Sequence, residues 1–172
     1  MEQCGAVFGE VGVMSSGHAL PMAIRAAYLA LHRRSDASFS ALGATADQFV
    51  LLATLVDGDV LTQRELARRM TSDPSTVRAM LVLLERKQLV VRDTRPDDAR
   101  GRTVRISAAG RKLYDRLWEA GEPIRNEILS ALTDREARQL VVLLEKVSAT
   151  LLPKRPQAAT PHTFSQGRNR DE

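Results

Sequence analysis

Residues 62–106 read TQRELARRMTSDPSTVRAMLVLLERKQLVVRDTRPDDARGRTVRI, and this stretch decides the fold. A short helix is expected over Thr62–Met70, because Thr62 followed by Glu65 is the pattern of a helix N-cap. Asp73-Pro74 opens a second helix, since Asp caps well and Pro fits the first turn. Two β-prone segments separated by a long charged loop follow, and they indicate a β-hairpin. The stretch therefore predicts a helix-turn-helix followed by a wing.

The second of these helices carries the side chains that we expect to read DNA. Its inner face is predicted from three apolar residues at helical spacing, Val77, Leu81 and Leu84. Arg78 points outward and can donate two hydrogen bonds to a guanine, while Ser75 and Thr76 can bond a base or a phosphate. Helix-turn-helix units also occur as plain packing units, in which an outward arginine is only a solvated side chain.

The charged loop favours the DNA-binding interpretation over that alternative. The hairpin carries five arginines, Arg92, Arg95, Arg100, Arg102 and Arg105. The same hairpin carries three acidic residues, Asp93, Asp97 and Asp98. An arginine-rich hairpin tip beside a recognition helix suits the minor groove, whose negative potential attracts guanidinium groups. A solvated charged loop remains the alternative.

Helices are also expected on both sides of this stretch. Thr45 with Gln48 and Thr133 with Glu136 repeat the capping-box pattern, and Ser107 caps another helix that Pro123 should kink. The helix over His18–Leu42 is amphipathic and ends at Gly43. In the helix over Thr45–Val56, the face expected to be buried is Phe49, Leu52, Ala53 and Val56. In the last helix it is Leu140, Leu143, Leu144, Val147 and Leu151.

Composition places the chain among globular, cytoplasmic proteins. It has 172 residues, of which 44% are hydrophobic, and charged residues interrupt every apolar run, so no membrane span is expected. The net charge of +4 is compatible with a polyanionic partner. The single cysteine, Cys4, fits a reducing compartment and is interpreted as an inert thiol, with a redox role as the alternative.

Nothing in the sequence predicts an enzyme, a cofactor or a metal site. No glycine-rich phosphate loop or catalytic motif occurs. His18, His32 and His162 are scattered and lack partners at metal-ligand spacing. Tyr28 and Trp118 are interpreted as interface or core aromatics, with stacking against a ligand as the alternative.

The helix-turn-helix and the hairpin resemble those of the MarR (multiple antibiotic resistance regulator) family. The similarity lies in Leu66–Met70, Ser75–Val77, Leu84–Lys87 and Leu89-Val90, and in the wing signature over Asp97–Ser107 with Gly110-Arg111. The resemblance implies a homodimeric regulator that represses genes and releases duplex DNA when a small aromatic or phenolic effector binds. It also implies that Arg100 is the wing-tip arginine and that Asp98 positions it.

Three sets of residues follow from the sequence and this resemblance together. The predicted DNA contacts are Thr62, Ser75, Thr76, Arg78, Arg86, Arg95, Asp98, Arg100 and Arg102. The predicted effector site, which rests mostly on the resemblance, is formed by Tyr28, His32 and Phe49. Homodimerisation is assigned to the terminal helices, because their apolar faces lie outside the winged-helix core and need a partner.

The expected organisation is mainly α, a winged helix-turn-helix core of four helices and a β-hairpin wing, with N- and C-terminal dimerisation helices. Residues 1–16 form a flexible arm, residues 17–152 the MarR-like domain, and residues 153–172 a disordered tail. Within the domain, residues 45–106 bind DNA, and residues 18–42 and 107–152 dimerise. The sequence predicts a DNA-binding transcription regulator acting on a pseudo-palindromic operator. The alternative is a winged-helix protein-interaction module that does not bind DNA.

The chain departs from the family pattern at the recognition helix. Gln88 follows that helix where the family usually has glycine, which should strain a left-handed cap by roughly 1 kcal/mol. Ala79, Val82 and Leu83 replace residues that are usually polar or basic. The resemblance therefore predicts fewer polar contacts from the C-terminal half of this helix.

Overall fold

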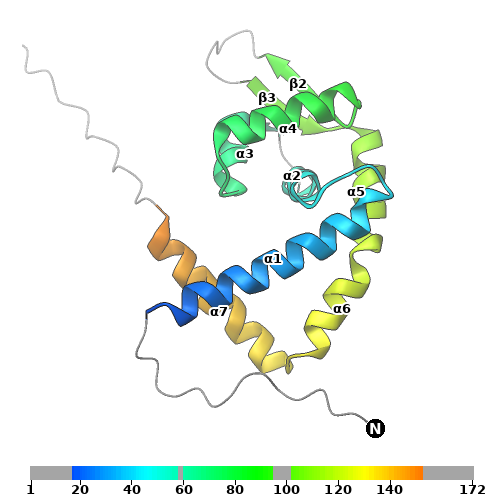
Figure 1. Ribbon diagram of the computed structural model, residues 1–172. Helices are drawn as coiled ribbons and strands as arrows, with labels where there is room; N and C mark the ends of the chain where they lie inside the picture. The colour runs from blue at the N-terminus through cyan, green and yellow to red at the C-terminus, as the bar shows by residue number, and fades with distance from the viewer. Residues whose placement is uncertain (1–16, 58–59, 95–101, 153–172) are drawn as a thin grey trace, which may run out of the picture. The chain divides into compact units, whose positions relative to one another are not determined.

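The computed structural model describes residues 17–57, 60–94 and 102–152. The predicted arm, the predicted tail and the tip of the wing lie outside these ranges. The chain divides into two units, one up to Ile128 and one from Leu129 onward, and each is described by itself. Figure 1 shows the elements of the first unit: α1 (Ala19–Ser40), α2 (Ala46–Val56), β1 (Leu61–Thr62), α3 (Gln63–Arg69), α4 (Pro74–Arg86), β2 (Val90–Thr94), β3 (Arg102–Ile106), α5 (Ala108–Ala120) and α6 (Glu122–Ser130). Helix α6 ends just beyond the boundary, and α7 (Asp134–Leu151) belongs to the second unit. The mainly helical winged-helix fold predicted from residues 62–106 is confirmed.

Polar side chains start the helices as expected, although only one of the three predicted capping boxes is complete. The hydroxyl groups of Thr45 and Thr62 accept hydrogen bonds from the backbone N–H groups of Gln48 (3.2 Å) and Glu65 (3.1 Å). The reciprocal bond is present at Thr133, whose backbone N–H donates to the carboxylate of Glu136 at 2.8 Å. The prediction of complete boxes at Thr45 and Thr62 is wrong. The reason is competition for the third residue: Glu65 binds arginines, and Gln48 is buried in the core.

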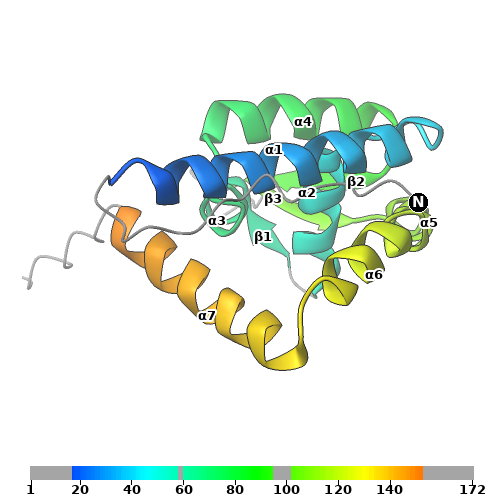
Figure 2. The same cartoon turned by 60° about the horizontal axis from the view of Figure 1, so that its bottom comes forward.

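The sheet contains one strand that the sequence did not predict. Strand β3 is central in the order β1-β3-β2, and all pairings are antiparallel. The hairpin register pairs Val90 with Ile106 and Thr94 with Arg102. Strand β1 is only two residues long and pairs Leu61 with Val104, as the edge beside α3 in Figure 2 shows. So short a strand has no periodicity of its own and depends on a distant partner.

The core forms between α2, the helix-turn-helix and α5. Its fully buried side chains are Leu51, Leu52, Leu55, Leu66, Val77, Leu81, Leu84, Val104 and Leu117. The predicted face of α4 is confirmed, whereas the predicted face of α2 is displaced by about one residue. Phe49 is only partly buried: its ring lies against Phe39 of α1 and stacks on Tyr114 of α5, and it also lines a pocket. The buried face of α2 therefore runs along Gln48, Leu51, Leu52 and Leu55.

The helix that Pro123 was expected to kink is in fact divided into α5 and α6. Helix α5 ends at Ala120 and α6 begins at Glu122, so Pro123 occupies a first-turn position that tolerates its missing N–H group. Leu117 and Ile124 are buried as predicted, and Ile128 is exposed. Gly121 at the junction is closely surrounded, because an added Cβ would lie 3.0 Å from Nη1 of Arg125.

Helix α7 corrects one further expectation, because none of its residues is buried. Its predicted face comprises Leu140, Leu143, Leu144 and Leu151, which are exposed, and Val147, which is partly buried. The spacing is that of an amphipathic helix, and the apolar face of this helix is exposed. The N-terminal half of α1 likewise exposes Leu20 and Met22.

Gln88 adopts the predicted left-handed conformation with φ 58°, which leads to a testable stability gain. We expect Gln88→Gly to raise the free energy of unfolding by about 1 kcal/mol, because glycine relieves the Cβ clash of this conformation. Gln88→Ala is the control, since alanine retains the Cβ atom. Denaturant titration of the three proteins measures the difference. Equal stabilities for the glycine and alanine variants would contradict strain at this cap.

Candidate nucleic-acid interface and ligand pocket

Helices α3 and α4 are joined by a tight turn that fixes the direction of α4. The backbone N–H of Met70 donates to the carbonyl of Leu66 (2.9 Å), and that of Ser72 donates to the carbonyl of Ala67 (3.0 Å). Between them Thr71 has φ 51°, a conformation that is rare for a β-branched residue. With Val77, Leu81 and Leu84 buried, the outer face of α4 is turned to solvent.

The predicted recognition residues lie on this outer face. Ser75, Thr76, Arg78 and Arg86 are all exposed, and Val82 is partly buried. Neither Arg78 nor Arg86 forms an ion pair with a residue in the described part of the chain. Their guanidinium groups are therefore available to phosphates or base edges.

Asp73, the N-cap residue of α4, carries a negative charge and binds Ser75, which is one of the predicted DNA contacts. The side chain of Asp73 accepts hydrogen bonds from the hydroxyl and the backbone N–H of Ser75, the latter at 2.7 Å. These bonds hold the pKa of Asp73 below its usual value. The hydroxyl hydrogen of Ser75 is thus used within the protein.

Helix α3 adds basic residues that the sequence analysis did not single out. Thr62, a predicted contact, is exposed and accepts the bond from Glu65 that caps α3. Glu65 in turn binds Arg68 and Arg69, and hydrogen bonds from these two arginines lower its pKa to about 2. The spacing of three and four residues from Glu65 was the sequence signal for these pairs.

The wing contributes fewer free arginines than its sequence indicated. Arg92 is not a solvent-facing charge: its side chain is 8% exposed, and Nη1 lies 3.0 Å from the Glu85 carboxylate of α4. With the amide of Gln63 turned so that its oxygen faces the guanidinium, that oxygen accepts from Nη2 (2.9 Å) and Nε (3.2 Å). Arg105 is paired with Asp93 at 3.5 Å. Arg92 thus acts as a positioning residue that ties β2 to α3 and α4.

The remaining predicted wing contacts fall mostly outside the described residues. This holds for Arg95, Asp98 and Arg100. For Arg102 the structure describes only the backbone, which lies in β3. Their contact with DNA stays a prediction.

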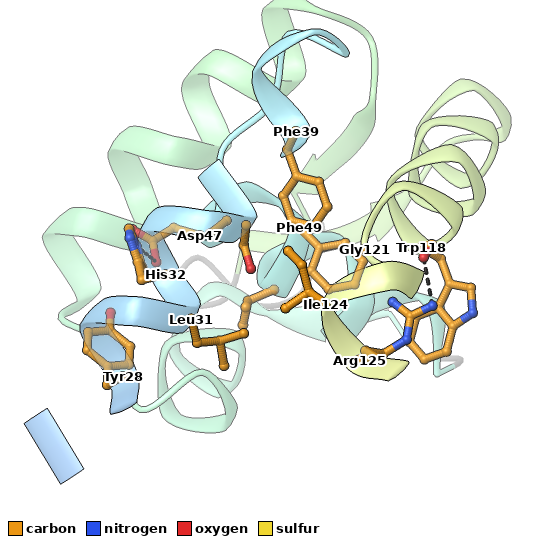
Figure 3. Close-up of a pocket in the computed structure, with 13 residues that line it drawn as sticks. Tyr28, Leu31, His32, Phe39, Asp47, Phe49, Trp118, Gly121, Ile124 and Arg125 are labelled. Carbon is orange, nitrogen blue, oxygen red and sulfur yellow. Dashed lines mark hydrogen bonds and ion pairs between the residues drawn. The ribbon is translucent and has the colours of Figure 1, made fainter. Parts of the chain in front are cut away.

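The three residues predicted for the effector site line a single pocket of about 280 Å³ in the first unit. Tyr28 and His32 come from α1, and Phe49 comes from α2. Figure 3 shows Trp118 and Arg125 on the opposite side, from α5 and α6, with Phe49 and Ile124 between. The walls are mostly apolar and aromatic: Phe49 lies 5.1 Å from Phe39 and 6.5 Å from Trp118 between ring centroids.

Among the polar side chains that line this pocket are His32 from α1 and Arg125 from α6. His32 lies between two carboxylates, with Nδ1 3.2 Å from Asp36 and Nε2 3.5 Å from Asp47. Arg125 lies over the Trp118 ring, with its guanidinium carbon 3.9 Å from the ring centroid, and donates to the Trp118 carbonyl at 2.8 Å. No local pattern in the sequence indicates Arg125, because its position depends on the junction at Gly121.

An ion pair connects α1 with α6 beside the pocket. Arg34 donates two hydrogen bonds to the carboxylate of Glu127, at 2.8 and 2.6 Å. This pairing raises the pKa of Arg34 and lowers that of Glu127. The two parallel hydrogen bonds give this exposed ion pair a defined geometry.

The described part of the chain contains neither a membrane-spanning helix nor a cluster of metal-ligating side chains. No helix there is long and apolar enough to cross a membrane. No group of His, Cys, Asp and Glu side chains in these residues could hold a metal ion.

An exposed second helix in a helix-turn-helix, followed by a β wing, defines the class of winged helix-turn-helix DNA-binding proteins. Residues 44–101 match the model of the MarR family. Over these residues, about a third of the chain, the protein is similar to the MarR family of transcription regulators.

Individual relatives and solved structures show the same similarity. The chain is 29% identical over 114 residues to an HTH-type transcriptional repressor of Mycobacterium tuberculosis, covering 66% of this chain and 82% of that protein. The matches to the curated relatives span 63–82% of those proteins. A mutant MarR of Escherichia coli complexed with operator DNA is 28% identical, with a TM-score of 0.68 and coverage of 74% and 92%. BpsR of Bordetella bronchiseptica, whose DNA binding is regulated by 6-hydroxynicotinic acid, is 26% identical, with a TM-score of 0.69 and coverage of 75% and 98%.

Proposed function

We propose that this protein is a sequence-specific repressor that binds a pseudo-palindromic operator as a homodimer and responds to a small aromatic effector. The observation that carries the DNA-binding role is the outer face of α4, where Arg78 and Arg86 are exposed and form no ion pair with a described residue. Arginines elsewhere in the same region, such as Arg92 and Arg105, have carboxylate partners. This contrast supports a role for Arg78 and Arg86 in binding another molecule.

The homodimer is supported by apolar surface on the terminal helices. Leu20 and Met22 of α1 and the leucines of α7 are exposed in one copy of the chain. Exposed apolar faces of this kind mark interaction surfaces, and two-fold pairing is the commonest way to cover them. Two recognition helices related by a two-fold axis would read half-sites about 10 base pairs apart, or a multiple of that spacing.

The effector response is supported by the pocket around Tyr28, His32 and Phe49. It is apolar with few polar groups, as small-molecule sites usually are. It is also lined by both α1 and α2, so a ligand there contacts a proposed dimerisation helix and a helix that packs on α3. In BpsR the regulating compound is 6-hydroxynicotinic acid, an aromatic acid.

Binding to the upstream region of the protein's own gene tests the DNA-binding role. We expect Arg78→Ala to cost about 1–3 kcal/mol on the operator and much less on random duplex, because the lost contact is to a base. Arg100→Ala is expected to weaken binding to both duplexes alike and to reduce the salt slope by about one counterion, as for a minor-groove or phosphate contact. Affinities across a salt series measure both effects.

Arg116→Ala is the matched control, since it removes one exposed positive charge from α5. It should leave affinity for both duplexes nearly unchanged. If the wild-type protein shows no preference for any duplex at any salt concentration, the proposed repressor role is wrong. The result would then favour the alternative, a winged-helix protein-interaction module.

A further inference from the structure

We propose that the middle of α4 selects thymine by contact with its 5-methyl group, and that Ala79 and Val82 make this contact. The inference rests on the proposed function, since it assumes that the outer face of α4 enters the major groove of an operator. It adds the base that this part of the helix selects and the two side chains that select it.

The outer face of α4 is polar at both ends and apolar in its middle. Because a helix has about 3.6 residues per turn, the line opposite the buried face runs through Ser75, Ala79, Val82 and Arg86. Ser75, Ala79 and Arg86 are exposed, and Val82 is partly buried. Met80, which is also partly buried, packs against the core and does not belong to this line.

The middle of this line offers no hydrogen-bonding side chain to a base. At its start, the Ser75 hydroxyl donates its hydrogen to Asp73. At its end, Arg86 lies in the last turn of the helix. Arg78 lies about a quarter turn to one side of the line. Ala79 and Val82, between the two ends, present only methyl groups.

Thymine is the base that suits such a surface. It alone among the four bases carries a methyl group in the major groove, and contact with an apolar side chain removes that group from water. A G·C pair presents no methyl group there. Its hydrogen-bonding groups would lose water without gaining a partner, which costs free energy. The apolar middle of α4 therefore favours thymine and rejects a G·C pair at the same place.

The spacing and shape of the two side chains fit one or two neighbouring bases. Ala79 and Val82 are separated by about 4.5 Å along the helix axis, little more than the rise of about 3.4 Å between successive base pairs. The small side chain of Ala79 lets the helix approach the bases closely. The β-branched side chain of Val82 is stiff, so it loses little conformational freedom on contact.

Replacing thymine with uracil tests the proposal, because uracil lacks only the 5-methyl group. The full-length protein is titrated with the duplex that it protects upstream of its own gene, and with copies in which each thymine in turn is replaced by deoxyuridine. We expect a loss of about fourfold at one or two adjacent positions in a half-site, the value of one buried methyl group. Replacement in both half-sites should cost about 15-fold, because the proposed dimer makes the contact twice.

Val82→Ala identifies the side chain responsible. It should bind the thymine duplex more weakly and lower the ratio of thymine to uracil affinity from about 15 to about 3 or less, because it removes most of the apolar surface at the methyl group. Arg78→Ala is the matched control on the same helix. It should weaken binding to both duplexes alike and leave the ratio unchanged. Thermal unfolding checks that both variants are folded, and the comparison of duplexes with the wild-type protein requires no variant.

The contrary results separate this inference from the proposed function. Sequence-specific binding that is equally tight with uracil at every position overturns the inference alone. A thymine preference that Val82→Ala retains in full also overturns it, because the preference would then belong to the shape of the DNA. A wild-type protein that does not prefer its operator to random duplex overturns the proposed function, and this inference with it.

Discussion

Leu144→Glu is expected to convert the protein from a dimer to a monomer and to lower operator affinity by at least about 100-fold. Leu144 is 41% exposed on the apolar face of α7. In the proposed dimer this face is buried against the partner copy, so the substitution places one uncompensated carboxylate per copy in an apolar interface. Light scattering measures the oligomeric state, and footprinting measures whether one or both half-sites are protected.

Ala149→Glu is the matched control on the same helix. Ala149 is also exposed, but it lies nearly opposite Leu144 around α7, away from the leucine row. This variant should remain dimeric and protect both half-sites. A wild-type protein that is monomeric at micromolar concentration, or a Leu144→Glu dimer that binds normally, would contradict α7 as an interface.

Leu81→Ala is expected to lower the free energy of unfolding by about 2–5 kcal/mol. Leu81 is completely buried on the inner face of α4, where it packs into the core that carries the helix-turn-helix. Truncation removes buried apolar surface and leaves a cavity that the surrounding side chains fill only partly. Denaturant unfolding measures the loss. Operator binding should fall with the folded fraction.

Leu83→Ala separates this effect from helix propensity. Leu83 lies two residues further along α4 and is 48% exposed. Alanine is the stronger helix former, so stability should change by less than about 1 kcal/mol. Equal losses at Leu81 and Leu83 would mean that the inner face of α4 is not the one described.

Local signals in the sequence determined the helix-turn-helix almost completely. The cap at Asp73 with Pro74 behind it, and the spacing of Val77, Leu81 and Leu84, act within a single helix. The left-handed Gln88 was also predictable, because a helix that ends and feeds a strand usually needs such a residue. These features depend on neighbours at most four residues away.

Two of the errors, at Phe49 and Arg92, share one physical cause, since both depend on groups that lie on other elements of the fold. Phe49 left the expected face of α2 because Tyr114 and Phe39 offered rings to pack against. Arg92 turned inward because Glu85 and Gln63 meet there only when β2 lies beside α3 and α4. From sequence alone, an arginine in a basic hairpin cannot be distinguished from one that holds the hairpin in place.

The residues that line the pocket fall into the same two groups, those predicted before the structure and those that only the structure places there. Its predicted members, Tyr28, His32 and Phe49, came from resemblance, and the structure brings them together around one space. Arg125 and Trp118 joined them only through the packing of α5 and α6. The sequence by itself determined the helices, their caps and the exposed arginines of α4, because capping and periodicity are local. The tertiary structure decided which arginines are free, which rings meet and where a charge faces an apolar cavity, because these depend on contacts between separate elements.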